Sequence, residues 1–318
     1  MQLYSIPTGY FKLDGGAMFG VVPKTLWNKI HPADDNNLCT WAMRCLLIED
    51  GGRLILVDNG IGDKQDAKFF SHYYLHGDDT LDKSLAVHGF RRDDITDVLL
   101  THLHFDHCGG SIVRSGSGPD ARLVPAFRNA TYWSHSRHWK WAMEPNDREK
   151  ASFLRENILP IEDSGRLRFV DMTAAAKAHT GGSGGVSTGA GGGLQSDPVG
   201  VVSGQLETIS DAIIPGLSVR MAYGHTDAMM LPQVSYKGKT VVFMADLLPS
   251  IGHIPIPYVM AYDMFPLTTL KEKKSFLEEA VAGGYVLFFE HDPENECCLV
   301  ETGERGLRAG KGFRLGEL

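Results

Sequence analysis

The stretch LLTHLHFDHCGGS, residues 99–111, places His102, His104, Asp106 and His107 within six positions, directly after an apolar run. His102 and His104 can converge on one metal ion where the chain leaves a strand, and Asp106 and His107 can turn toward a second. Imidazole and carboxylate ligands suit Zn²⁺, and also Mn²⁺, Fe²⁺ or Co²⁺. Four ligands are too many for one open catalytic zinc and too few for two, so we expect further ligands elsewhere.

Three other polar residues follow apolar segments that read as strands. They are His225 in RMAYGHTD, Asp246 in VVFMADLL and His291 in VLFFEHD. A polar group that interrupts an apolar segment is costly unless a metal or a hydrogen bond compensates. We therefore expect these residues to complete a metal site, with Gly109 and Gly110 allowing the chain to pack closely behind it.

The stretch THLHFDH resembles the H-x-H-x-D-H motif of the metallo-β-lactamase superfamily, and LILVDNG (54–60) resembles the first motif of that superfamily, with Asp58 as its aspartate. The resemblance implies an α/β fold, a four-layer αββα sandwich, and two divalent metal ions, most simply Zn²⁺. Carried over, it assigns His102, His104 and His225 to one ion and Asp106, His107 and His291 to the other, with Asp246 bridging them. Asp106 and Asp246 are then the catalytic carboxylates, and Asp58 either orients ligands or shapes a turn.

Three longer segments, 13–32, 127–139 and 244–277, are similar to YtnP-type quorum-quenching lactonases. This resemblance implies opening of an N-acyl-homoserine lactone or another lactone by attack of metal-bound hydroxide. The superfamily's di-iron redox branch generally carries a glutamate where this chain has His104, so the histidine favours hydrolysis with zinc.

One departure concerns a tyrosine that the best-known lactonases carry three residues after the bridging aspartate, where this chain has Pro249. His253, Tyr258 and Tyr223 are candidates to replace it, or else packed residues. Met18, Phe19 and Trp27 are candidates for an apolar acyl pocket. Their alternatives are the core or a homodimer contact.

The composition of the chain limits the classes of partner that we expect the protein to bind. Formal net charge is 31 − 39 = −8 without any Lys/Arg block, which argues against nucleic acid. No apolar run approaches eighteen residues and the start lacks a leader pattern, so we expect a cytoplasmic protein without membrane contact. Five cysteines, an odd number, predict reduced thiols. The expected partner is a small ester or lactone, and a homodimer is left open.

We expect one domain, 1–318, with a flexible Gly-rich insertion at about 178–200. Turn residues and apolar spacing predict two α/β halves, in the orders ββαβ and βββαβ. The expected elements are a hairpin at 45–63, a helix at 80–90 and a strand leading into the histidines. There follow a short strand and one or two helices within 127–170, a strand at 167–171, strands around a Lys-Gly turn after 216, a helix at 269–284 and a strand at 285–292.

The same two metals would also suit organophosphate or phosphodiester hydrolysis, which the sequence leaves open. Thioester hydrolysis of the glyoxalase II kind is disfavoured because only about 27 residues follow His291. β-Lactam hydrolysis gains no support from residues 13–32 or 244–277, and a non-catalytic metal-binding module would not need all seven ligands. The remaining histidines match no motif and are expected at the surface or in the core: His31, His72, His76, His88, His135, His138 and His179.

Overall fold

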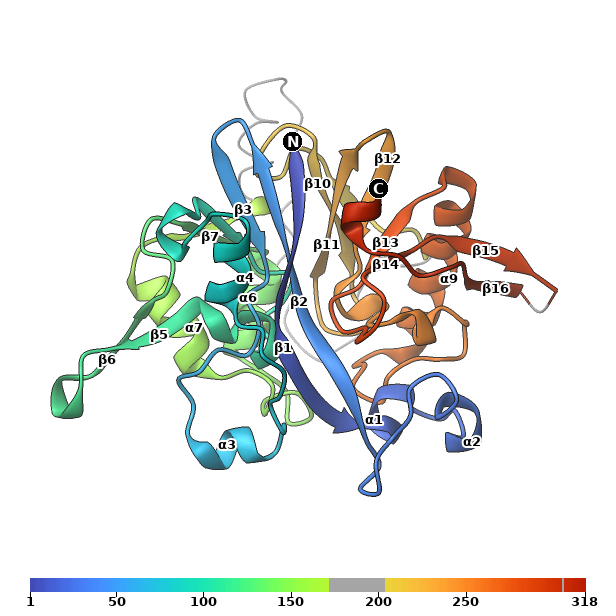
Figure 1. The fold of residues 1–318 in the computed structure, drawn as a ribbon, viewed down its shortest axis with the longest axis horizontal. Coiled ribbons are helices and arrows are strands. Elements are labelled where there is room, and N and C mark those ends of the chain that lie inside the picture. The colour runs from blue at the N-terminus through green and yellow to red at the C-terminus, as the bar shows by residue number, and fades with distance from the viewer. Residues whose placement is uncertain (172–203, 305) are drawn as a thin grey trace, which may run out of the picture.

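The computed structural model describes residues 1–171, 204–304 and 306–318, and within them two six-stranded sheets lie face to face with helices outside (Figure 1). This arrangement confirms the expected four-layer α/β sandwich. The Gly-rich insertion expected at 178–200, with His179, lies outside the described residues.

The first sheet has the order β1-β2-β3-β4-β7-β8. β1 to β3 pair antiparallel, while β3, β4, β7 and β8 pair parallel. The strands are β1 (Gln2–Asp14), β2 (Leu38–Asp50), β3 (Arg53–Val57), β4 (Asp97–Leu99), β7 (Thr131–Ser134) and β8 (Leu167–Phe169).

The second sheet has the order β14-β13-β12-β11-β10-β9. β12 and β13 pair parallel and the other neighbours antiparallel. The strands are β9 (Thr208–Ile209), β10 (Leu217–Ala222), β11 (Met229–Tyr236), β12 (Lys239–Phe243), β13 (Val286–Phe288) and β14 (Cys297–Cys298).

Side-chain alternation divides the interior into layers. In β3, Ile55 and Val57 join the core between the sheets, whereas Leu54 and Leu56 face the helices on the other side. Because all four are buried, this strand reads as continuously apolar in the sequence. Its outer side is covered by α4 (Leu81–Val87), α6 (Ser136–Met143) and α7 (Arg155–Asp163). The long helix α9 (Pro266–Gly283) packs against the second sheet (Figure 1).

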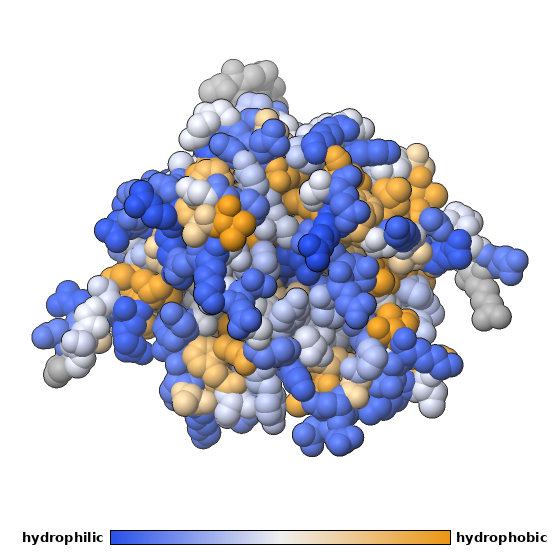
Figure 2. Space-filling view, viewed as in Figure 1, coloured by the Kyte–Doolittle hydropathy of each residue, from blue (hydrophilic) through white to orange (hydrophobic). Residues whose placement is uncertain are grey.

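Two hairpins extend from the body at opposite sides in Figure 1. They are β5–β6 (Ile112–Ser115 and Arg122–Pro125) and β15–β16 (Val300–Gly303 and Gly306–Ala309). The face shown in Figure 2 is largely hydrophilic, with apolar side chains in separate patches. Among the described helices, none combines the length and hydrophobicity that a bilayer crossing requires.

The hairpin at 45–63 is confirmed, with both turn glycines, Gly51 and Gly52, at positive φ. The expected helices at 80–90 and 269–284 are found as α4 and α9, the latter beginning three residues earlier at Pro266. All five cysteines are buried and unpaired, as expected.

The expected orders ββαβ and βββαβ are incomplete, because β1 opens the first sheet and was not predicted. Pro7 and Gly9 interrupt its apolar pattern, and its register with β2 shifts between Pro7 and Tyr10. The strand expected at 285–292 ends at Phe288, which releases the residues after it from the sheet.

Gly110 provides a test of close packing behind the loop that follows β4. A Cβ atom there would lie 2.2 Å from the carbonyl oxygen of Asn59, so Gly110→Ala is expected to lower the free energy of unfolding by about 1–3 kcal/mol. Gly316→Ala is the matched control, since no atom lies within 4 Å of its Cβ position. Urea denaturation measures both; equal midpoints for the two variants would contradict the expectation.

Candidate metal centre

Four strand ends from both sheets bring polar side chains to one edge of the sandwich. After β4, His102 and His104 lie in a loop, and Asp106 and His107 lie in the short helix α5 (Phe105–Cys108). The other three ligand candidates follow β10, β12 and β13: His225, Asp246 in a 3-10 turn at Ala245–Leu247, and His291. The structure thus brings all seven predicted ligand residues together.

These seven side chains are buried, with exposed fractions between 0% for His102 and 8% for Asp246. Their ligand atoms fall into two groups, each spanning less than 4.8 Å. The first group is His102, His104, His225 and Asp246; the second is Asp106, His107 and His291.

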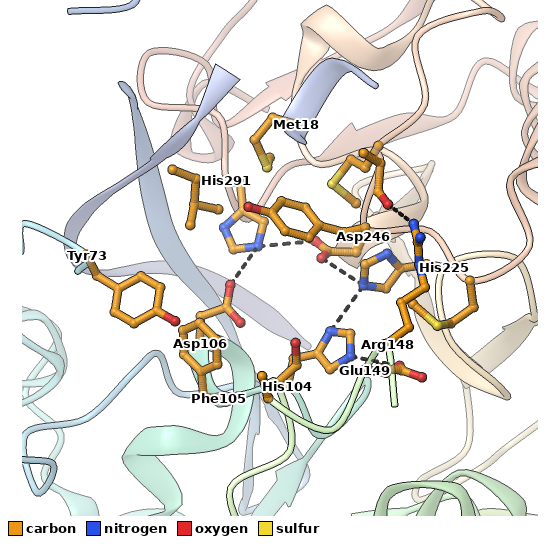
Figure 3. Close-up of a pocket in the computed structure, with 17 residues that line it drawn as sticks. Met18, Tyr73, His104, Phe105, Asp106, Arg148, Glu149, His225, Asp246 and His291 are labelled. Carbon is orange, nitrogen blue, oxygen red and sulfur yellow. Dashed lines mark hydrogen bonds and ion pairs between the residues drawn. The ribbon is translucent and has the colours of Figure 1, made fainter. Parts of the chain in front are cut away.

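Asp246 lies between the two groups (Figure 3). Its Oδ2 is 3.1 Å from Nε2 of His225, and its Oδ1 is 3.2 Å from Nε2 of His291. Asp106 Oδ2 lies 3.7 Å from the same nitrogen of His291. Asp246 is therefore placed to serve both groups with its two oxygens.

The donor atoms at the centre suit cations. Nδ1 of His104 and Nε2 of His225 face each other at 3.2 Å, while the outward nitrogen of each ring faces a buried carboxylate. With the ring protons on those outward nitrogens, two lone pairs point at one another. Among the described residues, His102 Nε2 is also buried without a hydrogen-bond partner. Divalent cations that accept nitrogen and oxygen ligands fit this set.

Buried carboxylates behind the histidines were missed by the sequence reasoning, apart from Asp58. Nδ1 of His107 lies 3.1 Å from Asp58 Oδ2 and 2.9 Å from Glu290 Oε2. Asp263 Oδ1 lies 3.0 Å from Nδ1 of His225. Glu290 carried a signal, since it is a charged residue at the end of the apolar run VLFF. Asp263 stands in an irregular segment and carried none.

Asp58 also holds the loop from which the first ligands project. Its two carboxylate oxygens accept hydrogen bonds from the backbone N–H of Thr101 at 2.8 Å and from its hydroxyl at 2.6 Å. The carboxylate therefore connects the end of β3 with the residue before His102.

The electrostatics of the cluster favour positive charge within it. Burial lowers the pKa of His225, but the carboxylates of Asp246 and Asp263 outweigh it and raise that pKa to about 10. Burial raises the pKa of Asp246, yet the surrounding histidines hold it well below its usual value. Protons and metal ions therefore compete for the same nitrogens.

A cavity of about 370 Å³ opens over the cluster (Figure 3). Its volume is within the range of small-molecule sites. Five of the seven ligand candidates reach it, whereas His102 and His107 lie behind them. The cavity is lined by Leu13, Met18, Tyr73, His104, Phe105, Asp106, Arg148, Glu149, Ala151, Ser152, His225, Asp246, Met260, Ala261, Tyr262, Met264 and His291.

Of the six residues expected in the pocket, the structure brings only Met18 to this cavity. Phe19 and Trp27 are fully buried in an aromatic cluster, where Phe19 also stacks on His253 at 4.7 Å between ring centroids. Tyr258 packs edge-on against Phe19.

Tyr223 lies under the Arg137 guanidinium, whose central carbon, Cζ, is 5.0 Å from the centroid of the tyrosine ring. Sequence reasoning missed Tyr73, Tyr262 and the methionines of 260–264, because an irregular loop carries no periodic signal.

A buried lysine on α9 supports the loop after Asp246. Nζ of Lys273 donates to the carbonyl oxygens of His253, Pro255 and Tyr258 at 2.8–3.1 Å. Burial lowers the pKa of Lys273 to about 7. Its three acceptors all belong to one loop segment, so this side chain fixes that segment to the helix.

Comparisons with known proteins agree with this geometry. The protein-family model described as "Metallo-beta-lactamase superfamily" matches residues 44–291 of this chain. A comparison with curated proteins finds no match.

Among solved structures, a probable metal-dependent hydrolase from Staphylococcus aureus aligns over 98% of this chain and 96% of its own, with a TM-score of 0.75 and 24% identity. AidC, a dizinc quorum-quenching lactonase, aligns over 98% and 95%, with a TM-score of 0.66 and 20% identity. The hydrolase AbOPH aligns over the same shares, with a TM-score of 0.68 and 19% identity. At these identities the similarity establishes the fold.

Lys273→Met is expected to lower the free energy of unfolding by roughly 2–5 kcal/mol, because buried carbonyl groups lose their donor. Lys274→Met is the control on the same helix, where the side chain is exposed, and a change within about 0.5 kcal/mol is expected. Chemical denaturation followed by circular dichroism compares the two. A Lys273→Met protein as stable as the Lys274→Met protein would show that the three carbonyl contacts contribute little.

Proposed function

The chain belongs to the metallo-beta-lactamase superfamily, and from this premise we propose that it opens lactone rings, N-acyl-homoserine lactones being the expected class. It is a metal-dependent hydrolase. The observation that carries the proposal is a buried cluster of histidines and aspartates at the floor of a largely apolar cavity.

In this proposal His102, His104 and His225 would hold one zinc ion, and Asp106, His107 and His291 would hold the other. Asp246 would serve both ions, since its two oxygens lie 3.1 Å from His225 Nε2 and 3.2 Å from His291 Nε2. Two divalent cations held here would supply a water nucleophile of lowered pKa and a Lewis acid for the carbonyl oxygen.

The protein's own groups have defined tasks in ring opening. Water adds to the lactone carbonyl carbon, the ring C–O bond breaks, and the leaving oxygen becomes a hydroxyl group. Asp106, an aspartate that lines the cavity, is placed to take the proton of the attacking water and return it to the leaving oxygen. Asp246 also lines the cavity, and its two oxygens face the two ligand groups, so its part in the reaction is to hold the cations.

The cavity walls suit an apolar substituent on the lactone. Leu13, Met18, Met260 and Met264 supply apolar surface, and methionine side chains adapt to ligands of varied shape. Burial and the nearby Asp106 carboxylate raise the pKa of Tyr73 to about 12. Its phenol therefore stays protonated and serves as a hydrogen-bond donor toward a bound substrate.

Two further lines support a lactone over other esters. The segments 13–32, 127–139 and 244–277 resemble YtnP-type lactonases, and AidC, which shares this fold, is a dizinc quorum-quenching lactonase. Phosphotriester hydrolysis is the alternative that the experiment below separates.

The test begins with metal analysis of protein purified without added metal, followed by a panel of acyl-homoserine lactones, simple lactones and phosphotriesters. Two zinc equivalents and turnover of lactones are expected. Turnover confined to phosphotriesters would replace the proposed substrate class, and less than one metal equivalent with no ester hydrolysis would contradict the proposal.

Asp246→Ala gives a second check on the same preparation. Lactone hydrolysis is expected to fall by more than about 100-fold, because losing even an outer partner of a metal ligand costs about 10–100-fold. Asp163→Ala, at an exposed position on α7, is the control and should retain full activity. Circular dichroism is the check that both variants fold. Unchanged hydrolysis in Asp246→Ala would exclude a bridging role.

A further inference from the structure

His104 uses its two ring nitrogens in different directions. Nδ1 faces the cluster, 3.2 Å from Nε2 of His225. Nε2 points away and lies 2.9 Å from Oε1 of Glu149 (Figure 3). A neutral imidazole carries one proton, and only the nitrogen without it offers a lone pair to a metal. The partner on Nε2 therefore decides which nitrogen is free for a cation.

Glu149 is itself held in place. Its side chain is buried, with an exposed fraction of 2%. Oε2 accepts hydrogen bonds from Nε1 of Trp141 at 2.6 Å and from Nδ2 of Asn146 at 3.3 Å. With Oε2 occupied by these two donors, Oε1 is directed at His104 in one orientation.

The segment that carries Glu149 also contacts the backbone beside His104. The carbonyl oxygen of Glu149 accepts from the N–H of Ser152 at 2.9 Å, and the carbonyl oxygen of Ser152 accepts from the N–H of Phe105 at 3.0 Å. The ring of His104 and the backbone of the next residue are thus both anchored to residues 149–152. No strand end supplies this segment, so it is independent of the four strand ends that position the ligands.

We propose that Glu149 is a positioning residue that holds His104 as the tautomer protonated at Nε2, with Nδ1 presented to the metal ion shared with His102 and His225. This inference rests on the proposed function only in assuming that the cluster holds metal. Removal of Glu149 then weakens the binding of one of the two ions selectively. Among the hydrogen bonds and ion pairs of the described residues, none joins Glu149 to Asp106, His107 or His291, the ligands of the second group.

The first experiment measures zinc affinity by chelator competition in wild type, Glu149→Ala and Lys150→Ala. In Glu149→Ala one ion is expected to bind about 10–100-fold more weakly, while the other keeps its affinity. Lys150→Ala is the matched control, since Lys150 is the next residue of the same segment, is exposed and bonds Asp147 rather than the cluster; its affinities should stay close to wild type. If Glu149→Ala bound each of the two ions with the same affinity as wild type, the proposal would be overturned.

A spectroscopic readout separates positioning from general stabilisation. With ¹¹³Cd²⁺ in place of zinc, wild type should give two resonances, and Glu149→Ala should shift or lose only one of them. Parallel changes in both resonances, together with a lower unfolding midpoint, would indicate a structural role alone and would refute positioning of His104.

A conservative pair keeps the test decisive if Glu149→Ala folds poorly. Glu149→Gln keeps an acceptor for His104 but turns its amide NH₂ toward the Trp141 N–H, so two donors face each other. Adding Trp141→Phe removes the nearer of the two facing donors, at 2.6 Å, and leaves only Nδ2 of Asn146 at 3.3 Å. The double variant should therefore recover metal affinity relative to Glu149→Gln alone. Absence of recovery would count against the proposal. A wild type that binds two zinc ions yet opens no lactone would contradict the proposed function and leave this test intact.

Discussion

Burial of several imidazole rings and carboxylates in one small volume is the constraint on which the rest of this structure depends. Charged and polar groups removed from water are strongly unfavourable unless each one finds a partner. The cluster is tolerated because its groups come in opposite kinds: Asp246 lies between His225 and His291 at 3.1 and 3.2 Å. The apolar layers on either side keep these groups from separating, and four strand ends fix their directions.

Buried carboxylates behind the histidines hold the rings in fixed orientations. Asp58, Glu290 and Asp263 each face the outward nitrogen of a histidine, and Asp58 also binds the backbone before His102. A ring with one nitrogen fixed in this way cannot rotate without leaving a buried carboxylate unpaired. These three carboxylates do not line the cavity, so part of the precision of the centre comes from behind the ligands.

Much of the fold and of the cluster could be predicted because the relevant signals are local. The spacing of His102, His104, Asp106 and His107 is readable from residues 99–111, and each remote partner stands at the end of an apolar run. Strand β1 could not be predicted because Pro7 and Gly9 interrupt its apolar pattern and its pairing with β2 is irregular. Phe19 and Trp27 are apolar aromatic residues of a kind that suits a pocket wall and a protein core equally well, and only their packing in the structure distinguishes the two. Asp263 and the cavity residues of 260–264 lie in irregular backbone, where spacing predicts nothing about direction.

Leu13 and Met18 reach the cavity from β1 and from helix α1 (Gly15–Phe19), ahead of the region, 44–291, that the superfamily model matches. The predicted metal ligands and part of the cavity wall therefore lie in different stretches of the chain. Substitutions in the early segment can alter which molecules fit without touching any ligand of the cluster. This division makes the chain modular: one part of the cavity wall can be exchanged by substitution while every ligand residue of the cluster stays as it is.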